Sequence, residues 1–149
     1  MFAAVFVKKI LPQLQYFAFH CKIGLFQESE RKKWVIKLKN TEIIKKSYEF
    51  RTVLKKGNCY RGFLFDTFVK KNGKEKNRLG IAVSKKAGNS VKRNYIKRLI
   101  RENYRLLENE LNMGNSIIIL WKKQADFNDF DYYSIKKEMT NLFKKSKLI

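Results

Sequence analysis

The positive charge of this chain constrains its fold more than any other feature. Its 149 residues include 34 Lys and Arg but only 13 Asp and Glu, which gives a formal net charge of +21. Self-repulsion of this size opposes a compact state unless a polyanion neutralises it, so nucleic acid or an anionic membrane surface is the expected partner. Hydrophobic residues still make up 44% of the chain, enough for the core of one domain. We therefore expect a folded, strongly basic domain.

The first 36 residues differ in pattern from the rest and are expected to be an N-terminal extension, followed by one domain over residues 37–149. They mix apolar and basic residues without clean periodicity and end in a charge cluster at 28–33. Two interpretations stay open. In one, the cluster is a translated ribosome-binding site, Val35 is the true start, and residues 1–34 are dispensable. In the other, the extension is a disordered or amphipathic tail whose residues 1–26 bind a membrane surface.

Other compositional signals exclude several protein classes. No segment reaches the ~20 mostly apolar residues that a membrane-spanning helix needs, and the N-terminus lacks the charge order of a secretory signal. The cytoplasm is therefore the expected location, and a membrane is the less expected of the two anionic partners. Cys21 and Cys59 follow no ligand spacing, which excludes a disulfide framework and a zinc finger and favours free thiols.

Hydrophobic periodicity predicts an α+β fold with the element order α-β-β-(β)-α-β-α. A helix is expected over 41–57, ending in a left-handed cap at Gly57. A strand is expected over 59–71, with a split or bend at Gly62, and the Asn-Gly pair after it predicts a hairpin loop to a strand over 78–86. The remaining elements are a helix capped by Asn89 or Ser90, a central strand over 115–123 and a helix over 131–149 capped by Asp131.

The 59–71 strand carries more aromatic residues than one core face needs. Alternation places Phe63, Phe65, Thr67 and Val69 on one face, and Leu64, Asp66 and Phe68 on the other. Exposed aromatic rings beside basic groups are typical of surfaces that hold single-stranded nucleic acid. Phe68, which shares its face with a polar neighbour, is the best candidate for such a ring.

The helix that follows Asn89 has a one-sided basic face. At ~100° per residue a set of its basic and amide side chains falls within an arc of roughly 140°, and the members of this arc are Arg93, Asn94, Lys97, Arg98, Arg101 and Arg105. A separate apolar arc contains Ile96, Leu99, Ile100, Leu106 and Leu107. Solvated faces normally mix charges, yet residues 70–101 contain 12 basic residues and one acid. The basic face is therefore interpreted as a phosphate-binding ridge, since arginine makes two hydrogen bonds to one phosphate.

The start of this helix adds further anion-binding groups. Lys85 and Lys86 end the preceding strand, and Gly88 permits the turn before Asn89. Backbone N–H groups at residues 89–90 are available to an anion, as at other helix N-termini. The predicted phosphate-binding set therefore includes Lys85, Lys86, Asn89 and Arg105 as well as the ridge residues between Asn89 and Arg105.

The run GIAVSKKAGNSVKRNYIKRLIRENYR resembles the signature of the bacterial ribonuclease P protein family. The matching residues are Ser84, Lys85, Lys86, Gly88, Asn89, Val91, Arg93, Asn94, Lys97, Arg98, Arg101 and Glu102. A weaker resemblance extends from Lys37 to the C-terminus. The family usually has Arg-Asn-Arg where this chain has Arg93-Asn94-Tyr95.

The resemblance implies an α/β sandwich with a left-handed crossover. It also implies a subunit that binds the catalytic RNA of ribonuclease P and the 5′ leader of precursor tRNA, promoting endonucleolytic removal of the leader. The RNA performs the hydrolysis with magnesium ions, so the chain belongs to an endoribonuclease but has no catalytic residue of its own. Arg93, Asn94, Lys97, Arg98 and Arg101 are implied to contact the RNA subunit. Phe50 and Phe68 are implied to hold the leader, together with Leu54, which stands where the family has a second aromatic residue.

The residues themselves show no self-sufficient active site and no metal site. Asp126, Asp129 and Asp131 have irregular spacing and are more typical of a loop and a helix cap. No obligate protein partner is predicted. Two alternatives to the family assignment are a ribosomal or RNA-chaperone protein and a DNA-binding factor, whereas membrane-surface binding through residues 1–26 is compatible with that assignment. Generic basic proteins of the first kind lack the signature found over residues 83–101. The strands around the basic helix argue against a helix-turn-helix DNA-binding protein.

Overall fold

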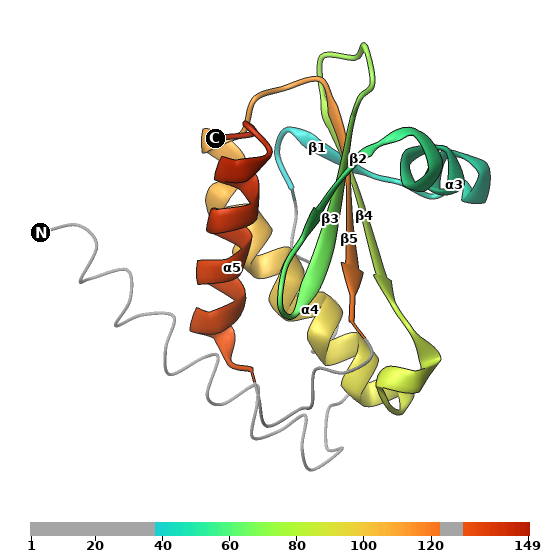
Figure 1. Ribbon diagram of the computed structural model, residues 1–149, viewed down its shortest axis with the longest axis vertical. Coiled ribbons are helices and arrows are strands. Elements are labelled where there is room, and N and C mark those ends of the chain that lie inside the picture. The colour runs from blue at the N-terminus through green and yellow to red at the C-terminus, as the bar shows by residue number, and fades with distance from the viewer. Residues whose placement is uncertain (1–37, 123–129) are drawn as a thin grey trace, which may run out of the picture. The chain divides into compact units, whose positions relative to one another are not determined.

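Five strands form one mixed sheet in the order β1-β4-β5-β3-β2 (Figure 1). The computed structural model describes residues 38–122 and 130–149, all within one compact unit over 36–149. The strands are β1 (Thr41–Ile43), β2 (Asn58–Arg61), β3 (Phe65–Lys71), β4 (Asn77–Val83) and β5 (Asn115–Trp121). β1, β4 and β5 run parallel, β3 is antiparallel to β5, and β2 is antiparallel to β3.

Helices cover both faces of this sheet, as Figure 1 shows. The helices are α3 (Ser47–Lys56), α4 (Ser90–Leu107) and α5 (Tyr132–Lys145), with short 3-10 turns at Lys85–Ala87 and Glu108–Glu110. α4 and α5 pack together on one face, and α3 crosses the other face over β3 and β5. The predicted α+β sandwich with a small mixed sheet is confirmed.

The larger core lies between the sheet and the α4–α5 layer. Phe65 and Trp121 stack with ring centroids 6.2 Å apart, and Tyr104 meets Phe143 edge-on at 6.0 Å. The predicted apolar face of the last helix is confirmed, since Ile135, Met139, Leu142 and Phe143 are all buried. On α4 the buried set also includes Asn103 and Tyr104, whereas Leu106, expected in the core, is only half-buried.

The helix predicted to begin at Thr41 begins instead at Ser47. Thr41–Ile43 forms β1, which pairs in parallel with Asn77–Leu79 of β4. The carboxylate of Glu108 accepts hydrogen bonds from the N–H groups of Lys39 and Asn40 at 3.0 and 2.9 Å, which fixes the entry to β1. These partners are 36 or more residues away, so tertiary pairing overrides the local helical periodicity.

The hairpin predicted between residues 59–71 and 78–86 is wrong. β3 and β4 are not neighbours, because β5 lies between them and pairs with both. Ile117, Ile118 and Ile119 of β5 are 0% exposed, as expected for a central strand covered on both faces. The prediction of a central strand here is therefore confirmed. The segment β4–α4–β5 forms the crossover connection, and its left-handedness stays a prediction.

The 59–71 run divides into β2 and β3 at Gly62, as its glycine indicated, but two side chains differ from the predicted alternation. Phe63 lies in the β2–β3 turn and is 80% exposed, while Leu64 is buried in the core. Phe65 and Thr67 face the core as expected. Only residues 65–71 keep a regular strand, so alternation holds from Phe65 onward.

Gly57 ends α3 but does not adopt the predicted left-handed conformation, since its φ is −87°. Its N–H donates to the carbonyl oxygen of Val53 at 2.8 Å. A Cβ at this position would lie 2.5 Å from that same oxygen and 3.1 Å from the carbonyl oxygen of Val69. Glycine is needed here because the helix end approaches β3 closely.

Candidate RNA interface

The N-terminus of α4 is built by two successive side-chain caps. Ser84 Oγ accepts a hydrogen bond from the N–H of Lys86 at 3.3 Å, and Asn89 Oδ1 accepts one from the N–H of Lys92 at 2.9 Å. Gly88 between them has a φ of 134°, a conformation that side chains rarely adopt. The predicted cap at Asn89 is confirmed, and the turn leaves Lys85 and Lys86 exposed beside it.

The ridge on α4 begins at Arg93, whose guanidinium is fixed by the same turn. Its Nη1 donates to the carbonyl oxygen of Gly88 at 2.6 Å. Asn94 is exposed, and Lys97, Arg98 and Arg101 are half-buried along the helix. Burial lowers the pKa of Arg101, and the charge of Arg98 lowers it further, although an arginine stays protonated at neutral pH. The ridge thus holds several cations close together, which an anion would stabilise.

Arg105, at the C-terminal end of the ridge, has its charge balanced within the helix. Its Nη2 lies 2.6 Å from Oε1 of Glu102, and this hydrogen bond raises the pKa of Arg105. Burial raises the pKa of nearby Tyr132 to about 12, and the Glu102 charge adds to the rise. The basic character of the ridge is therefore concentrated between Arg93 and Arg101.

The opposite face of the sheet carries the three residues predicted to hold the leader. Gly80, Ile118 and Phe68 stand in one row across β4, β5 and β3. The ring of Phe50 lies on Gly80, where a Cβ would be 2.8 Å from its Cε2 atom. Phe50 and Phe68 are both half-buried, so each residue keeps an accessible part. Leu54 lies one helical turn after Phe50 on α3 and is half-buried as well.

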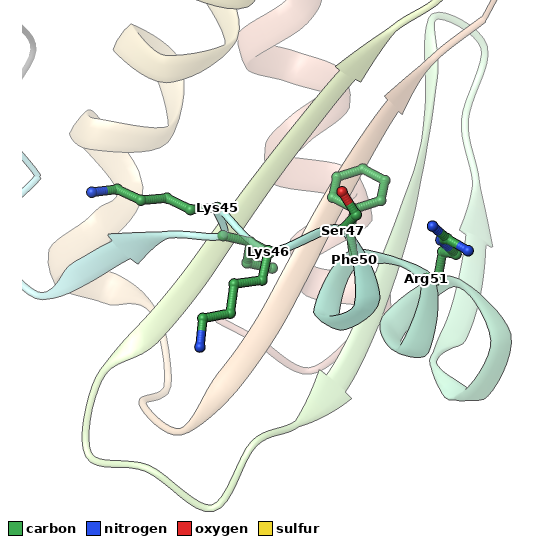
Figure 2. A pocket seen from close by; sticks show the side chains of 6 residues that line it. Lys45, Lys46, Ser47, Phe50 and Arg51 are labelled. Carbon is green, nitrogen blue, oxygen red and sulfur yellow. The ribbon is translucent and has the colours of Figure 1, made fainter.

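A hollow of about 380 Å³ opens beside Phe50 at the start of α3. Figure 2 shows Phe50 directed toward the sheet, while the side chains of Lys45, Lys46 and Arg51 extend outward around it. These three cations are exposed. Sequence reasoning missed them because residues 45–46 were assigned to the interior of a helix and not to its entrance.

The acidic groups on this face are paired with cations of the same chain. Lys122 Nζ lies 3.3 Å from Asp66 Oδ1, and Arg78 Nη1 lies 2.8 Å from Glu49 Oε1. The hydrogen bond between Arg78 and Glu49 lowers the pKa of Glu49 and raises the pKa of Arg78. A polyanion on this face would therefore meet carboxylates whose charge is already balanced.

The sequence-predicted residues fall into two separate groups. Phe50, Leu54 and Phe68 lie on the α3 face, and we call these three residues together with the hollow beside Phe50 the aromatic cleft. Lys85, Lys86 and the α4 ridge lie at the end of β4 and on the helix that covers the other face. Of the three acids considered earlier, Asp131 caps α5 in a reciprocal pair with Ser134, and Asp126 and Asp129 lie outside the described residues. The N-terminal hypotheses about residues 1–36 also fall outside them.

The described part of the chain contains no group of three His, Cys, Asp or Glu side chains that could hold a metal ion. Within residues 38–122 and 130–149, no helix combines the length and apolarity needed to cross a membrane.

Comparison with known proteins gives one consistent family. The family model described as Ribonuclease P matches residues 38–147. The ribonuclease P protein component of Natranaerobius thermophilus is 42% identical over 106 residues, covering 71% of this chain and 90% of that protein. That of Clostridium botulinum is 41% identical over 104 residues, covering 69% and 92%.

Solved structures agree with this result. The ribonuclease P protein of Thermotoga maritima superposes with a TM-score of 0.65 at 28% identity, covering 70% of this chain and 96% of that one. A Staphylococcus aureus ribonuclease P protein, a mutant described as defective in mRNA degradation, also gives a TM-score of 0.65, at 33% identity and 72% and 89% coverage.

Proposed function

Since this chain belongs to the ribonuclease P protein family, we propose that its α4 ridge binds the catalytic RNA subunit and that its aromatic cleft binds the 5′ leader of precursor tRNA. Membership makes the chain a protein subunit of an endoribonuclease that processes tRNA precursors. The assignment of the two surfaces rests on the charge of the ridge and the half-buried rings of the cleft.

The α4 ridge suits a folded RNA. Arg93 is held by Gly88, and the caps at Ser84 and Asn89 fix the neighbouring turn. A preorganised set of cations loses little conformational entropy when it binds phosphates. Lys85, Lys86, Asn89, Asn94, Lys97, Arg98, Arg101 and Arg105 complete the proposed contact set. Binding here would also relieve the repulsion between Arg98 and Arg101.

The aromatic cleft suits a single strand. Exposed parts of Phe50 and Phe68 offer faces for stacking, and the cations around the hollow of α3 are placed to meet the backbone. Leu54 adds apolar contact without a π face. Stacking and charge contacts tolerate any base, so leaders of different sequence would bind alike.

The chain contributes binding and orientation, and we propose no catalytic residue in it. The described acids are paired, capping or scattered, and they do not fit a magnesium site. Magnesium is therefore assigned to the RNA subunit, where it supplies the Lewis-acid chemistry of phosphodiester hydrolysis. We also propose a cytoplasmic location, a domain over residues 37–149, and an N-terminal segment that is dispensable for processing.

One assay tests this proposal directly. Precursor tRNA is incubated at low magnesium with a bacterial ribonuclease P RNA, with and without the full chain. Cleavage at the leader junction only when the protein is present supports the subunit role. Tight but indiscriminate RNA binding without stimulated cleavage would contradict it and favour an RNA chaperone.

A further inference from the structure

The β2–β3 turn presents a phenylalanine to solvent. Phe63 is 80% exposed, the most exposed of the large hydrophobic residues in the described part of the chain. An aromatic side chain kept in water forgoes the stabilisation of burial. Single exposed hydrophobic residues are common on protein surfaces, so Phe63 becomes informative only through its surroundings.

The turn that carries Phe63 is fixed on both sides. Glu138 of α5 accepts hydrogen bonds from the N–H groups of Leu64 at 2.8 Å and Phe65 at 3.2 Å. The N–H of Gly62 donates to Asp66 Oδ1 at 3.3 Å, and Lys122 Nζ donates to the carbonyl oxygen of Gly62. These bonds hold the backbone on each side of Phe63, so its ring extends from a rigid support.

A hollow of about 440 Å³ lies between this turn and α5. Its rim carries Arg61 from β2 and Lys137 and Lys145 from α5, all exposed, with the exposed amide of Asn141 between the two lysines. The acid in the lining is Glu138, whose oxygens already accept the turn's N–H groups. The hollow therefore combines one free aromatic face, three cations and one amide.

We propose that this hollow, the Phe63 groove, is a second site for single-stranded RNA. A base would stack on Phe63, phosphates would contact Arg61, Lys137 and Lys145, and Asn141 would hydrogen-bond a base edge or ribose. The combination of stacking ring and basic rim is the chemistry that single strands need. The groove faces α5, whereas the aromatic cleft lies on the α3 face, so the two sites are distinct and this inference does not depend on the leader assignment.

Charge argues for RNA over a protein ligand. The chain carries a net charge of +21, and three cations surround a groove whose single carboxylate is engaged. A polyanion gains from each of these cations and releases counterions on binding. An acidic peptide is the competing ligand and is included in the test.

The test uses the full chain labelled with 15N and titrated with a ten-nucleotide single-stranded oligoadenylate. We expect the amide signals of Gly62, Phe63 and Leu64 and the side-chain amide of Asn141 to shift together. Phe63→Ala should weaken the affinity read from these signals roughly 5- to 150-fold, the loss of one stacked base, and Phe63→Trp should restore it. Lys137→Glu with Lys145→Glu should weaken it as well and reduce its salt dependence.

Tyr133→Ala is the matched control, because Tyr133 is 54% exposed on α5 but does not line the groove. This variant should leave the RNA-induced shifts of the groove signals unchanged. The unfolding midpoint of each variant distinguishes a loss of binding from a loss of structure. RNA-induced shifts confined to the α4 ridge and the aromatic cleft would overturn the proposal. So would a deca-glutamate peptide that shifts the groove signals when the RNA does not. The ridge and cleft are unaltered in all these variants, so either outcome leaves the leader assignment to its own assay.

Discussion

Phe50 lies on Gly80 so closely that a Cβ at residue 80 would be 2.8 Å from the ring. This contact positions α3 on the sheet and sets one wall of the aromatic cleft. Gly80→Ala should therefore displace Phe50, lowering the free energy of unfolding by about 1–3 kcal/mol as overpacked cores do. It should also weaken the binding of precursor tRNA. Titration with precursor tRNA measures the affinity, and urea unfolding measures the stability.

Gly73→Asn is the control for this change. Gly73 has a φ of 65°, and no atom lies within 4 Å of a Cβ built there. Asparagine tolerates that conformation better than other residues, so both stability and binding should change little. If Gly80→Ala changed neither the free energy of unfolding nor the affinity for precursor tRNA, the position of Phe50 would matter for neither.

Reversing the charge of Arg93 or Arg98 should weaken assembly with the RNA subunit. Each lost phosphate contact should also reduce the slope of log affinity against log salt by about 1. Lys55→Glu, an equal charge change at the exposed end of α3, should leave this slope closer to that of the unmodified chain. Filter binding at several salt concentrations measures both quantities, and identical slopes for all variants would contradict the ridge assignment.

Phe68→Ala should weaken the binding of precursor tRNA more than that of mature tRNA. Loss of one stacked base costs about 1–3 kcal/mol, and only the precursor has a leader. Phe68→Tyr retains a ring and should bind the precursor normally. Equal losses for both RNAs would mean that Phe68 acts through the fold and not through the leader.

Leu54→Phe should strengthen precursor binding. Leu54 is half-buried one turn after Phe50, so a ring at this position would add a π face to the same wall, worth up to about 1 kcal/mol. Leu54→Met, which fills similar space without a ring, is the matched variant and should have no such effect. Comparable affinities for the two variants would exclude stacking at this position.

Tyr104 should make stability depend on pH in the alkaline range. Burial raises its pKa well above the ordinary value, and its hydroxyl lies 3.1 Å from Thr41 Oγ1. Above about pH 10 the unfolded chain loses this proton first, so the free energy of unfolding falls as pH rises. Lysine titration also changes stability in this range, and comparison with Tyr104→Phe removes that contribution.

At pH 8 the unmodified chain should be more stable than Tyr104→Phe by about 1 kcal/mol, the value of the lost hydrogen bond. By pH 11 that advantage should be lost, because one proton bound differentially over one pH unit is worth about 1.4 kcal/mol. Urea unfolding at both pH values measures the difference. A constant difference would show that the hydroxyl titrates normally in the folded state.

Local chemistry was predictable wherever neighbouring residues decide it. The caps at Asn89 and Asp131 were predicted, because their side chains bond N–H groups three residues ahead. The buried stripe of α5 follows from helical spacing in the same way. The burial of Tyr104 on α4 was missed, because its contacts with Thr41 and Phe143 come from elements far along the chain.

The sequence-based prediction was wrong in two places where strands pair with partners far along the chain. Thr41–Ile43 carries a helical pattern, but its partner is β4, and the Asn-Gly pair at 72–73 is typical of hairpins although β5 separates the two strands. For the site, both groups of residues could be proposed from sequence, whereas the cations around Phe50 and the exposed ring of Phe63 required the fold.

The position of β5 also has a consequence for the order of folding. Before residues 115–121 are synthesised, the chain has only two ribbons, β1 with β4 and β2 with β3, and neither is stable alone. β5 joins them, so the five-stranded sheet is completed only when these residues are available. A nascent chain therefore exposes its basic helix α4 before the core has formed. The time during which this helix can bind other RNAs is set by the rate of folding.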